Sequence, residues 1–294
     1  MKKFIDHLVW AVQDLEAAKK SWETLGFQAT PRGTHPFGTA NHLLMADQFF
    51  VELLSVMDPS KVIPNAANQL SFSALNQAFL AKDQGVSMIV LASEDAEADV
   101  ANYRALGLKT YPPTYFSRGI TLPDGTTAEV AFSIAFVVSP ASTSLSFFIC
   151  QHYYPVHFWK KDYQLHANSF VGIKRVVLVV ETPEKQEGFF SKLLGTPANI
   201  IDGVYQFTTP AETILLMTRA QFRERNGVSL GVKKEGVQLV VFQVKDLHQL
   251  QKIAERSDFR MVKISPESLL LQDPVTDIWL QFEKIKIKIK GYAT

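Results

Sequence analysis

The sequence contains a single cysteine, Cys150, among 294 residues, so no disulfide can form within the chain. That scarcity favours a reducing compartment. No uncharged apolar stretch approaches the roughly 20 residues that a membrane-spanning helix needs. Near the N-terminus, Asp6 and His7 interrupt the apolar run that a secretory signal requires. The formal net charge of +1 gives no overall field to attract nucleic acid or an anionic membrane. We therefore expect a soluble, cytoplasmic protein with no nucleic-acid and no membrane partner.

What the sequence does contain is a repeated order of strand, helix and further strands. In the first copy, an apolar run over residues 4–12 precedes an aspartate suited to a helix N-cap, a helical apolar stripe and Gly26. The same order returns 81 residues later and ends at Gly107. Two further copies follow in the second half of the chain. The four expected helix starts are Asp14, Asp95, Thr182 and Asp246.

These copies predict an α+β protein of four βαβββ modules, with sheets curved around cavities and helices outside. We expect two domains, spanning residues 1–155 (modules 4–56 and 86–152) and 172–290 (modules 172–220 and 236–290). An aromatic-rich connector over 151–171 separates them. An unrelated α+β protein with short helices is the alternative. The lysines that alternate over 284–290 indicate an edge strand whose charges discourage pairing with another strand. A basic strip that binds nucleic acid is the less favoured alternative.

Several strings carry a family likeness. Residues 5–9 (IDHLV) precede Asp14, and residues 50–53 (FVEL) form a later strand. Further supporting strings lie at 35–44, 147–152 and 166–168. Together they resemble the glyoxalase-like domain proteins of the vicinal oxygen chelate superfamily, which also includes glyoxalases, bleomycin-resistance proteins and dioxygenases. The resemblance covers roughly residues 4–180 and weakens in the last two modules.

The resemblance implies a cavity between modules one and two, where first and last strands hold a divalent metal such as Zn, Ni, Mn, Fe or Co. His7 stands at the first-strand ligand position and Glu52 at the last-strand position. Module two offers Met88 opposite His7 and Cys150 opposite Glu52, and Met88 is a poor ligand for hard ions. We therefore expect a metal site of His7, Glu52 and His152, with Cys150 as a further candidate.

Other roles for these residues remain open. His7 is alternatively a core histidine bonded to Asp6, and Cys150 a small buried hydrophobe. A carboxylate inside the apolar strand around Glu52 needs a partner, a proton or a metal, so Glu52 is also the candidate catalytic general base. The alternative is that Glu52 lies at an exposed strand edge and needs no partner. Extradiol dioxygenases of similar length carry their ligands in the second half, where this chain has Arg175, Leu239 and Gln281 instead.

Candidate substrate-binding residues are His35, Asn41 and Arg118. Arg118 precedes a turn over 123–125, and its guanidinium suits a carboxylate or phosphate, with a solvated loop arginine as the alternative. His35 and Asn41 alternatively cap turns.

We expect a metal-dependent lyase or isomerase that acts on a small oxygen-rich molecule. The alternatives are a non-catalytic protein that sequesters a small molecule, as bleomycin-resistance proteins do, and a silent scaffold. The sequence leaves a homodimer open.

Overall fold

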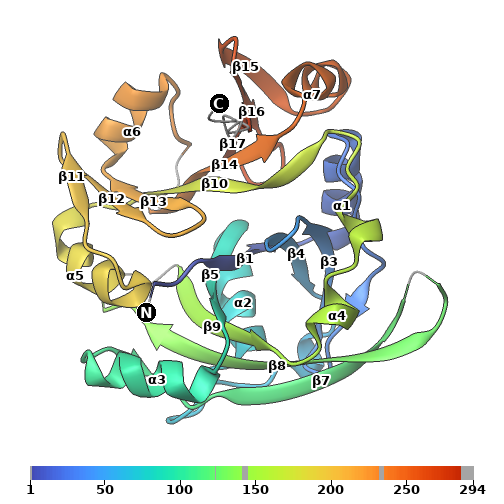
Figure 1. The fold of residues 1–294 in the computed structure, drawn as a ribbon, viewed down its shortest axis with the longest axis vertical. Coiled ribbons are helices and arrows are strands. Elements are labelled where there is room, and N and C mark those ends of the chain that lie inside the picture. Colours follow the sequence, from blue (N-terminus) through green and yellow to red (C-terminus); the bar gives the residue numbers. More distant parts are fainter. Residues whose placement is uncertain (1, 123, 141–144, 232–234, 286–294) are drawn as a thin grey trace, which may run out of the picture.

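The computed structural model describes residues 2–285 except 123, 141–144 and 232–234. This part of the chain forms two mixed β-sheets with few helices, which confirms the α+β class (Figure 1). The α-helices are α1 (Leu15–Thr24), α2 (Phe72–Leu80), α3 (Ala96–Ala105), α4 (Pro155–Phe158), α5 (Pro183–Leu194), α6 (Arg219–Asn226) and α7 (Leu247–Ala254). The short 3-10 helices are η1 (Pro59–Lys61) and η2 (Lys161–Gln164). None of the described helices has the length and apolar character to cross a membrane.

The first sheet is formed by two modules that meet at their first strands. Its strands are β1 (Ile5–Ala11), β2 (Gly33–Thr34), β3 (Thr39–Met45), β4 (Phe50–Val56), β5 (Gly85–Ser93), β6 (Lys109–Thr110), β7 (Thr114–Thr121), β8 (Thr127–Val138) and β9 (Ser146–His152). Their spatial order is β2-β3-β4-β1-β5-β9-β8-β6, with β7 paired to β8. The β1–β4 and β5–β9 pairs are parallel, whereas β1 and β5 meet antiparallel at the centre.

The second sheet repeats this arrangement. Its strands are β10 (Phe170–Val179), β11 (Asn199–Ile201), β12 (Val204–Thr208), β13 (Thr213–Met217), β14 (Gly236–Val244), β15 (Arg260–Ser265), β16 (Ser268–Gln272) and β17 (Trp279–Lys284). Their order is β11-β12-β13-β10-β14-β17-β16-β15, with β10 and β14 antiparallel at the centre. The expected arrangement of four modules in two pairs is therefore confirmed. Most of the lysine-rich segment, from residue 286 onward, lies outside the described residues.

One hydrophobic core joins the two sheets. The rings of Trp22 in α1 and Phe242 in β14 lie 6.3 Å apart, and those of Phe147 in β9 and Phe190 in α5 lie 5.5 Å apart. Figure 1 shows the second sheet lying across the first, with α1 and α5 on opposite sides of the molecule. Because this core is shared, the division into domains spanning 1–155 and 172–290 stays a prediction.

The helices begin at the residues that the sequence predicts. The side chains of Asp14, Asp95 and Asp246 each accept a hydrogen bond from the backbone N–H three residues further on. These bonds satisfy N–H groups that have no partner within the helix. Thr182 precedes α5 without such a bond, and Pro183 stands at the first helical position, where no N–H is needed. All four expected helix starts are confirmed.

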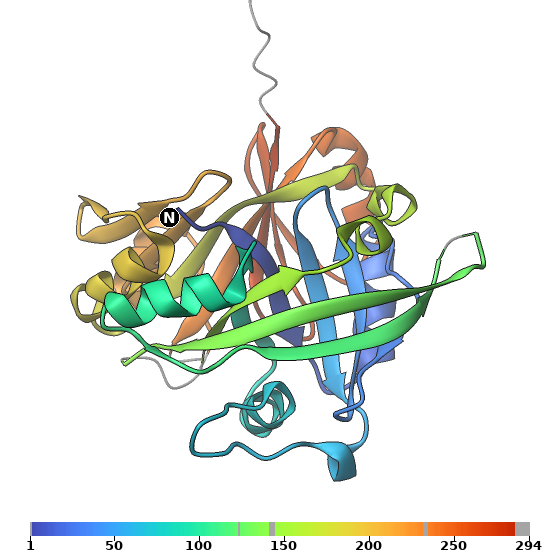
Figure 2. The ribbon, with the colours of Figure 1, turned by 60° about the horizontal axis from the view of Figure 1, so that its bottom comes forward.

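The two faces of the first sheet have different surroundings. Along β4, Val51 and Leu53 point into the core shared with the second sheet, while Phe50 and Glu52 line a cavity on the other face. On the corresponding face of the second sheet, apolar side chains that include Phe222 and Trp279 form a packed cluster. The long β7–β8 hairpin extends across the cavity side of the first sheet (Figure 2).

Candidate active site

The inner cavity of the first sheet has a volume of about 50 Å³. Its walls are mainly aromatic, and its polar groups are few. The lining residues are His7, His35, Phe37, Asn41, Leu43, Phe50, Glu52, Phe72, Phe116, Arg118, Phe132, Ile134, Phe148, Cys150 and Phe158. A mostly apolar cavity with a few converging polar groups is the usual form of a small-molecule site.

A β-bulge in β1 directs two consecutive side chains toward this site. Ile5 pairs with Leu91 of β5 and His7 pairs with Val90, so Asp6 is an extra residue in the ladder. Side chains normally alternate between the faces of a sheet, and a bulge breaks this alternation. Ile5 therefore points into the shared core, while Asp6 and His7 form a hydrogen bond on the cavity side.

Asp6 links two histidines. Its Oδ2 lies 2.6 Å from His7 Nδ1, and both of its carboxylate oxygens lie 3.2 Å from His152 Nε2. Burial alone would raise the pKa of Asp6, but the charges and hydrogen bonds of His152 and His7 hold this pKa well below its ordinary value. Asp6 is therefore ionised and can only accept, so each histidine donates an N–H to it. His7 is left with Nε2 directed away from Asp6.

Glu52 faces that nitrogen. Its Oε2 lies 3.7 Å from His7 Nε2, and its Oε1 accepts a hydrogen bond of 2.6 Å from Asn41 Nδ2. Burial raises the pKa of Glu52, and this effect outweighs the opposing influence of His7, Asn41 and Arg118. The predicted pairing of His7 with a buried Glu52 in one cavity is thus present in the structure. A carboxyl with a raised pKa beside an imidazole is a frequent feature of acid–base sites.

His35 lies beside Asn41. Its Nδ1 is 2.8 Å from Thr39 Oγ1, and its Nε2 is 3.4 Å from Asn41 Nδ2. Burial, aided by the charge of Arg118, lowers the pKa of His35 to about 3. His35 is consequently neutral at neutral pH. It supports Asn41, which in turn holds Glu52.

Arg118 reaches the site from β7 and stands between two cavities. It lines the inner cavity and also an outer cleft of about 480 Å³. The two spaces share Asn41, Leu43, Arg118 and Phe158. Arg118 was expected next to a turn, and the structure places it mid-strand in the hairpin that the turn closes. This position contradicts the alternative of a solvated loop arginine.

The connector between the sheets also shapes the site. Phe158 of α4 lines the inner cavity, and the ring of Trp159 stacks on His152 at 5.7 Å. Further along, His166 Nε2 donates to the carbonyl of Met45, and Asn168 Nδ2 donates to the carbonyl of Leu25. The histidine and asparagine of the family-like string 166–168 therefore fasten the connector to module one and do not line the inner cavity.

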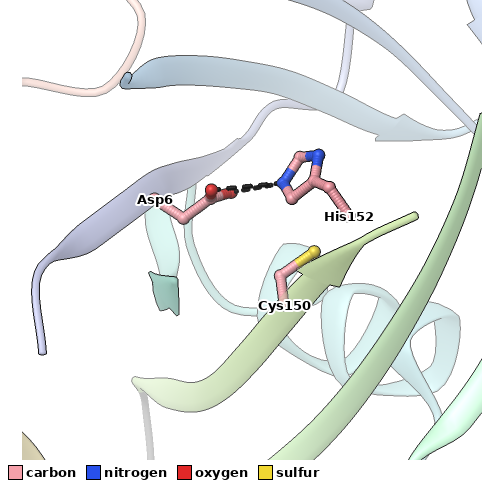
Figure 3. Close-up of side chains that lie close together, drawn as sticks. All are labelled: Asp6, Cys150 and His152. Atoms are coloured by element: carbon pink, nitrogen blue, oxygen red, sulfur yellow. Dashed lines mark hydrogen bonds and ion pairs between the residues drawn. The ribbon is translucent and has the colours of Figure 1, made fainter. Parts of the chain in front are cut away.

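The predicted metal ligands do not gather around one point. His7 meets Glu52, while His152 lies behind Asp6 and does not line the inner cavity. Within the described part of the chain, the group whose ligand atoms lie within 4.8 Å of one another is Asp6, Cys150 and His152 (Figure 3). His152 and the further candidate Cys150 belong to it, whereas His7 and Glu52 do not.

This group suits a divalent ion chemically. Carboxylate, thiolate and imidazole together form a ligand set that Zn²⁺ accepts. Burial, with the charges of Asp6 and Glu52, raises the pKa of the Cys150 thiol well above its ordinary value. His152 Nδ1 is buried without a hydrogen-bond partner. A cation would favour the thiolate form of Cys150, so the residues present fit a metal, although not at the positions expected from the superfamily.

The strand register explains this difference. Glu52 of β4 pairs with Val9 of β1, and Phe148 of β9 pairs with Val90, which lies 81 residues after Val9. Phe148, and not Cys150, therefore occupies the position equivalent to Glu52. Because Met88 is equivalent to His7, module two contributes apolar side chains at both of the expected ligand positions.

Comparison with known families agrees with the module arrangement of the first sheet. The model of the glyoxalase-like domain family matches residues 5–194, nearly two thirds of the chain. This protein belongs to the glyoxalase-like domain family. The match covers the whole first sheet with its cavity and reaches the end of α5. A search of curated proteins found no match.

Solved structures share the fold of this glyoxalase-like protein at low sequence identity. A hypothetical protein from Staphylococcus aureus has 15% identity and a TM-score of 0.68, with 96% of this chain and 99% of that chain covered. A variant of 4-hydroxymandelate synthase from Streptomyces coelicolor has 10% identity and a TM-score of 0.58, with coverage of 96% and 92%. A fusion of a xylose isomerase-like TIM barrel with 4-hydroxyphenylpyruvate dioxygenase has 12% identity and a TM-score of 0.63; the likeness covers 100% of this chain and 51% of the fusion.

The second half of this glyoxalase-like protein keeps the backbone but not the site. Its β10 contains the same bulge, because Ile173 pairs with Phe242 and Arg175 pairs with Val241. The residues equivalent to Asp6 and His7 are Lys174 and Arg175, and Lys174 pairs with Glu283. Positive side chains at this bulge do not suit a cation. The candidate active site is therefore confined to the first sheet among the described residues.

Proposed function

We propose that this glyoxalase-like protein is an enzyme that transfers a proton on a small molecule bound in the inner cavity. The observation that carries this proposal is the buried array of Glu52, His7 and Asp6. A distance of 3.7 Å between Glu52 Oε2 and His7 Nε2 is too long for a hydrogen bond. Both atoms therefore remain available to contact one substrate group that lies beside them in the cavity.

Each member of the array has a distinct role in this proposal. Glu52 acts as the general base, because burial raises its pKa toward the pH range in which a general base works best. His7 Nε2, 3.7 Å from Glu52 Oε2, receives or returns a proton at a neighbouring atom of the same substrate. Asp6 is a positioning residue that fixes the tautomer of His7, and Asn41 holds Glu52 in place. Abstraction of a proton next to a carbonyl begins both isomerisation and elimination.

A metal-dependent reaction is the second candidate, favoured by the close approach of Asp6, Cys150 and His152. When bound, a divalent ion at these residues would supply Lewis-acid activation of a substrate oxygen. Metal analysis of purified wild-type protein and of the variants Cys150→Ser and His7→Gln tests this candidate. Stoichiometric metal that is lost in Cys150→Ser and retained in His7→Gln supports it, whereas equal metal content in wild type and Cys150→Ser contradicts it.

Incubation with a small-molecule extract of the organism that carries the gene tests the enzymatic proposal. Mass spectrometry compares the extract after treatment with wild type, Glu52→Gln and the surface control Glu224→Gln. We expect at least one compound to be converted by wild type and by the control but not by Glu52→Gln. Retention of a compound without conversion would instead support the sequestering function, and equal conversion by Glu52→Gln would contradict the role of Glu52.

A further inference from the structure

Arg118 is a half-buried residue whose guanidinium has no direct partner among the described residues. Its Nε is buried and makes no hydrogen bond, and no ion pair with this side chain is found among the described residues. Glu52 acts on it only electrostatically, and desolvation lowers the pKa of Arg118 in spite of that charge. Guanidinium groups carry five N–H donors, and leaving even one of them, here the Nε–H, unpaired away from water is costly. A ligand that accepts this hydrogen bond would remove the cost.

The local backbone holds open the space around this group. If Gly33 had a Cβ atom, that atom would overlap Asn41 Oδ1 and would lie 3.0 Å from Arg118 Nη2. Asn41 Oδ1 is itself buried without a hydrogen-bond partner. Two unpaired polar groups, one of them charged, thus meet beside a glycine where the inner cavity joins the outer cleft.

The charge of the outer cleft has one sign. Arg32, Arg118 and Lys160 line it, and none of the residues that line it is an aspartate or a glutamate; Arg32 Nη1 lies 3.9 Å from Glu16 Oε1, which is outside the lining. The chain as a whole has a formal charge of only +1, so this local excess of positive charge is a feature of the cleft. A cleft with charges of one sign raises the local concentration of oppositely charged ligands.

From these observations we propose that the site binds an organic acid whose carboxylate forms paired hydrogen bonds with Arg118. The carbon next to the carboxylate then points inward to Glu52 and His7, and the rest of the molecule lies in the outer cleft. The volumes fit this orientation, because about 50 Å³ takes only a few heavy atoms whereas about 480 Å³ takes a larger group. A carboxylate is preferred because its two oxygens match the planar fork of a guanidinium.

Binding of 3-phenylpropanoate and of its uncharged amide to the full chain tests this inference. Calorimetry would compare wild type, Arg118→Gln and the matched control Arg225→Gln, whose arginine pairs with Asp202 in the second half of the chain. We expect the acid to bind wild type and the control equally and Arg118→Gln at least about tenfold more weakly. We expect the amide to bind weakly to all three. Failure of the acid to bind, or equal affinity for Arg118→Gln, would overturn the proposal.

Thermal unfolding without ligand supplies a second readout. A guanidinium kept for a ligand costs stability in the free protein, so Arg118→Gln should unfold at a higher temperature than wild type. A lower unfolding temperature would show that Arg118 has a structural role and would contradict the proposal. Inorganic phosphate serves as a competing anion, and tighter binding of phosphate than of the acid, dependent on Arg118, would overturn the choice of a carboxylate.

This inference rests on the proposed function only for the identity of the reacting carbon. The binding measurements need no turnover, so the two proposals can fail separately. Binding of the acid that depends on Arg118, together with no conversion of any compound, would leave the anion site standing and contradict the enzymatic proposal. Conversion of an uncharged compound at a rate unaffected by Arg118→Gln would support the enzymatic proposal and contradict the anion site.

Discussion

Asp6 Oδ2 lies 2.6 Å from His7 Nδ1, although the two residues are consecutive in one strand. Neighbours in a regular strand point to opposite faces, and the bulge at Asp6 is what brings both to the cavity side. The arrangement sets the tautomer of His7, because an ionised carboxylate can only accept its proton. The orientation of the imidazole toward Glu52 therefore depends on a backbone irregularity.

Replacement of Asp6 by asparagine tests this dependence. The amide nitrogen of asparagine can donate to His7 Nδ1, so we expect the proton of His7 to move to Nε2 in Asp6→Asn. Nitrogen NMR of labelled histidine would show the change of tautomer, and we expect turnover of any substrate to fall by about 100-fold or more. Asp95→Asn is a suitable control because asparagine caps helices as well as aspartate does. An unchanged His7 tautomer would contradict the role assigned to Asp6.

Glu52→Gln should increase stability while it removes the general base. Because the folded protein raises the pKa of Glu52, it binds this proton more tightly than the unfolded chain does. The stability that this proton contributes is present below the ordinary glutamate pKa of 4.5 and is lost as the pH rises through the folded value. We expect denaturant titrations at neutral pH to show a gain of roughly 1 kcal/mol or more for Glu52→Gln. The gain should shrink as the pH falls, and the surface variant Glu224→Gln should show neither effect.

Gly33→Ala should disturb the site through contact alone. The added methyl group would press on Asn41 and Arg118, and Asn41 would be displaced from Glu52. We expect a loss of roughly 1–3 kcal/mol in the free energy of unfolding, as is typical of overpacking, and weaker binding of the acid. Gly119→Ala on β7 is the matched control, because a Cβ there meets no atom within 4 Å. Equal effects of the two substitutions would contradict the close packing at Gly33.

Glu212 connects the second half of the chain to the bulged strand. Its Oε1 accepts hydrogen bonds from the backbone N–H of Ile5 and from Thr209 Oγ1, each 2.8 Å long. Burial raises the pKa of Glu212 to about 7. Its proton therefore stabilises the fold at acidic pH, and this stabilisation is lost as the pH rises from about 4.5 to about 7. Denaturant titrations at pH 5 and pH 8 should show that wild type loses up to about 3 kcal/mol relative to Glu212→Gln over this range. A constant difference would contradict the shifted pKa.

The sequence predicts the modules well because each helix start has a local signal. Asp14, Asp95 and Asp246 cap their helices by bonds to residues only three positions away, so no tertiary contact is needed to recognise them. The pairing of His7 with Glu52 was also predictable, through the family resemblance and the rarity of a carboxylate in an apolar strand.

The sequence named Asp6 only as the hydrogen-bond partner of His7 in the alternative of a core histidine; that bond is present, but Asp6 was not predicted as a member of the site. Strand alternation places Asp6 and His7 on opposite faces, and the bulge that reverses this appears only in the pairing of β1 with β5. The one available signal was an acidic residue in an apolar strand, the same signal that singled out Glu52. The sequence aligned Cys150 with Glu52 because aromatic residues precede both, and only the register of β9 with β5 shows that Phe148, two residues earlier, is the equivalent of Glu52. The register between strands that are distant in the chain cannot be inferred from a single sequence.

Incorporation of solvent deuterium into a converted metabolite most directly tests whether Glu52 and His7 form a proton-transfer site. The protein would be incubated in D₂O with the compound that it converts, and mass spectrometry would follow both substrate and product. We expect wild type to introduce deuterium at one carbon next to the carboxylate, and we expect Glu52→Gln and His7→Gln to lose this labelling while Glu224→Gln retains it. Conversion without deuterium in substrate or product, or labelling by Glu52→Gln at the wild-type rate, would show that Glu52 and His7 do not form a proton-transfer site.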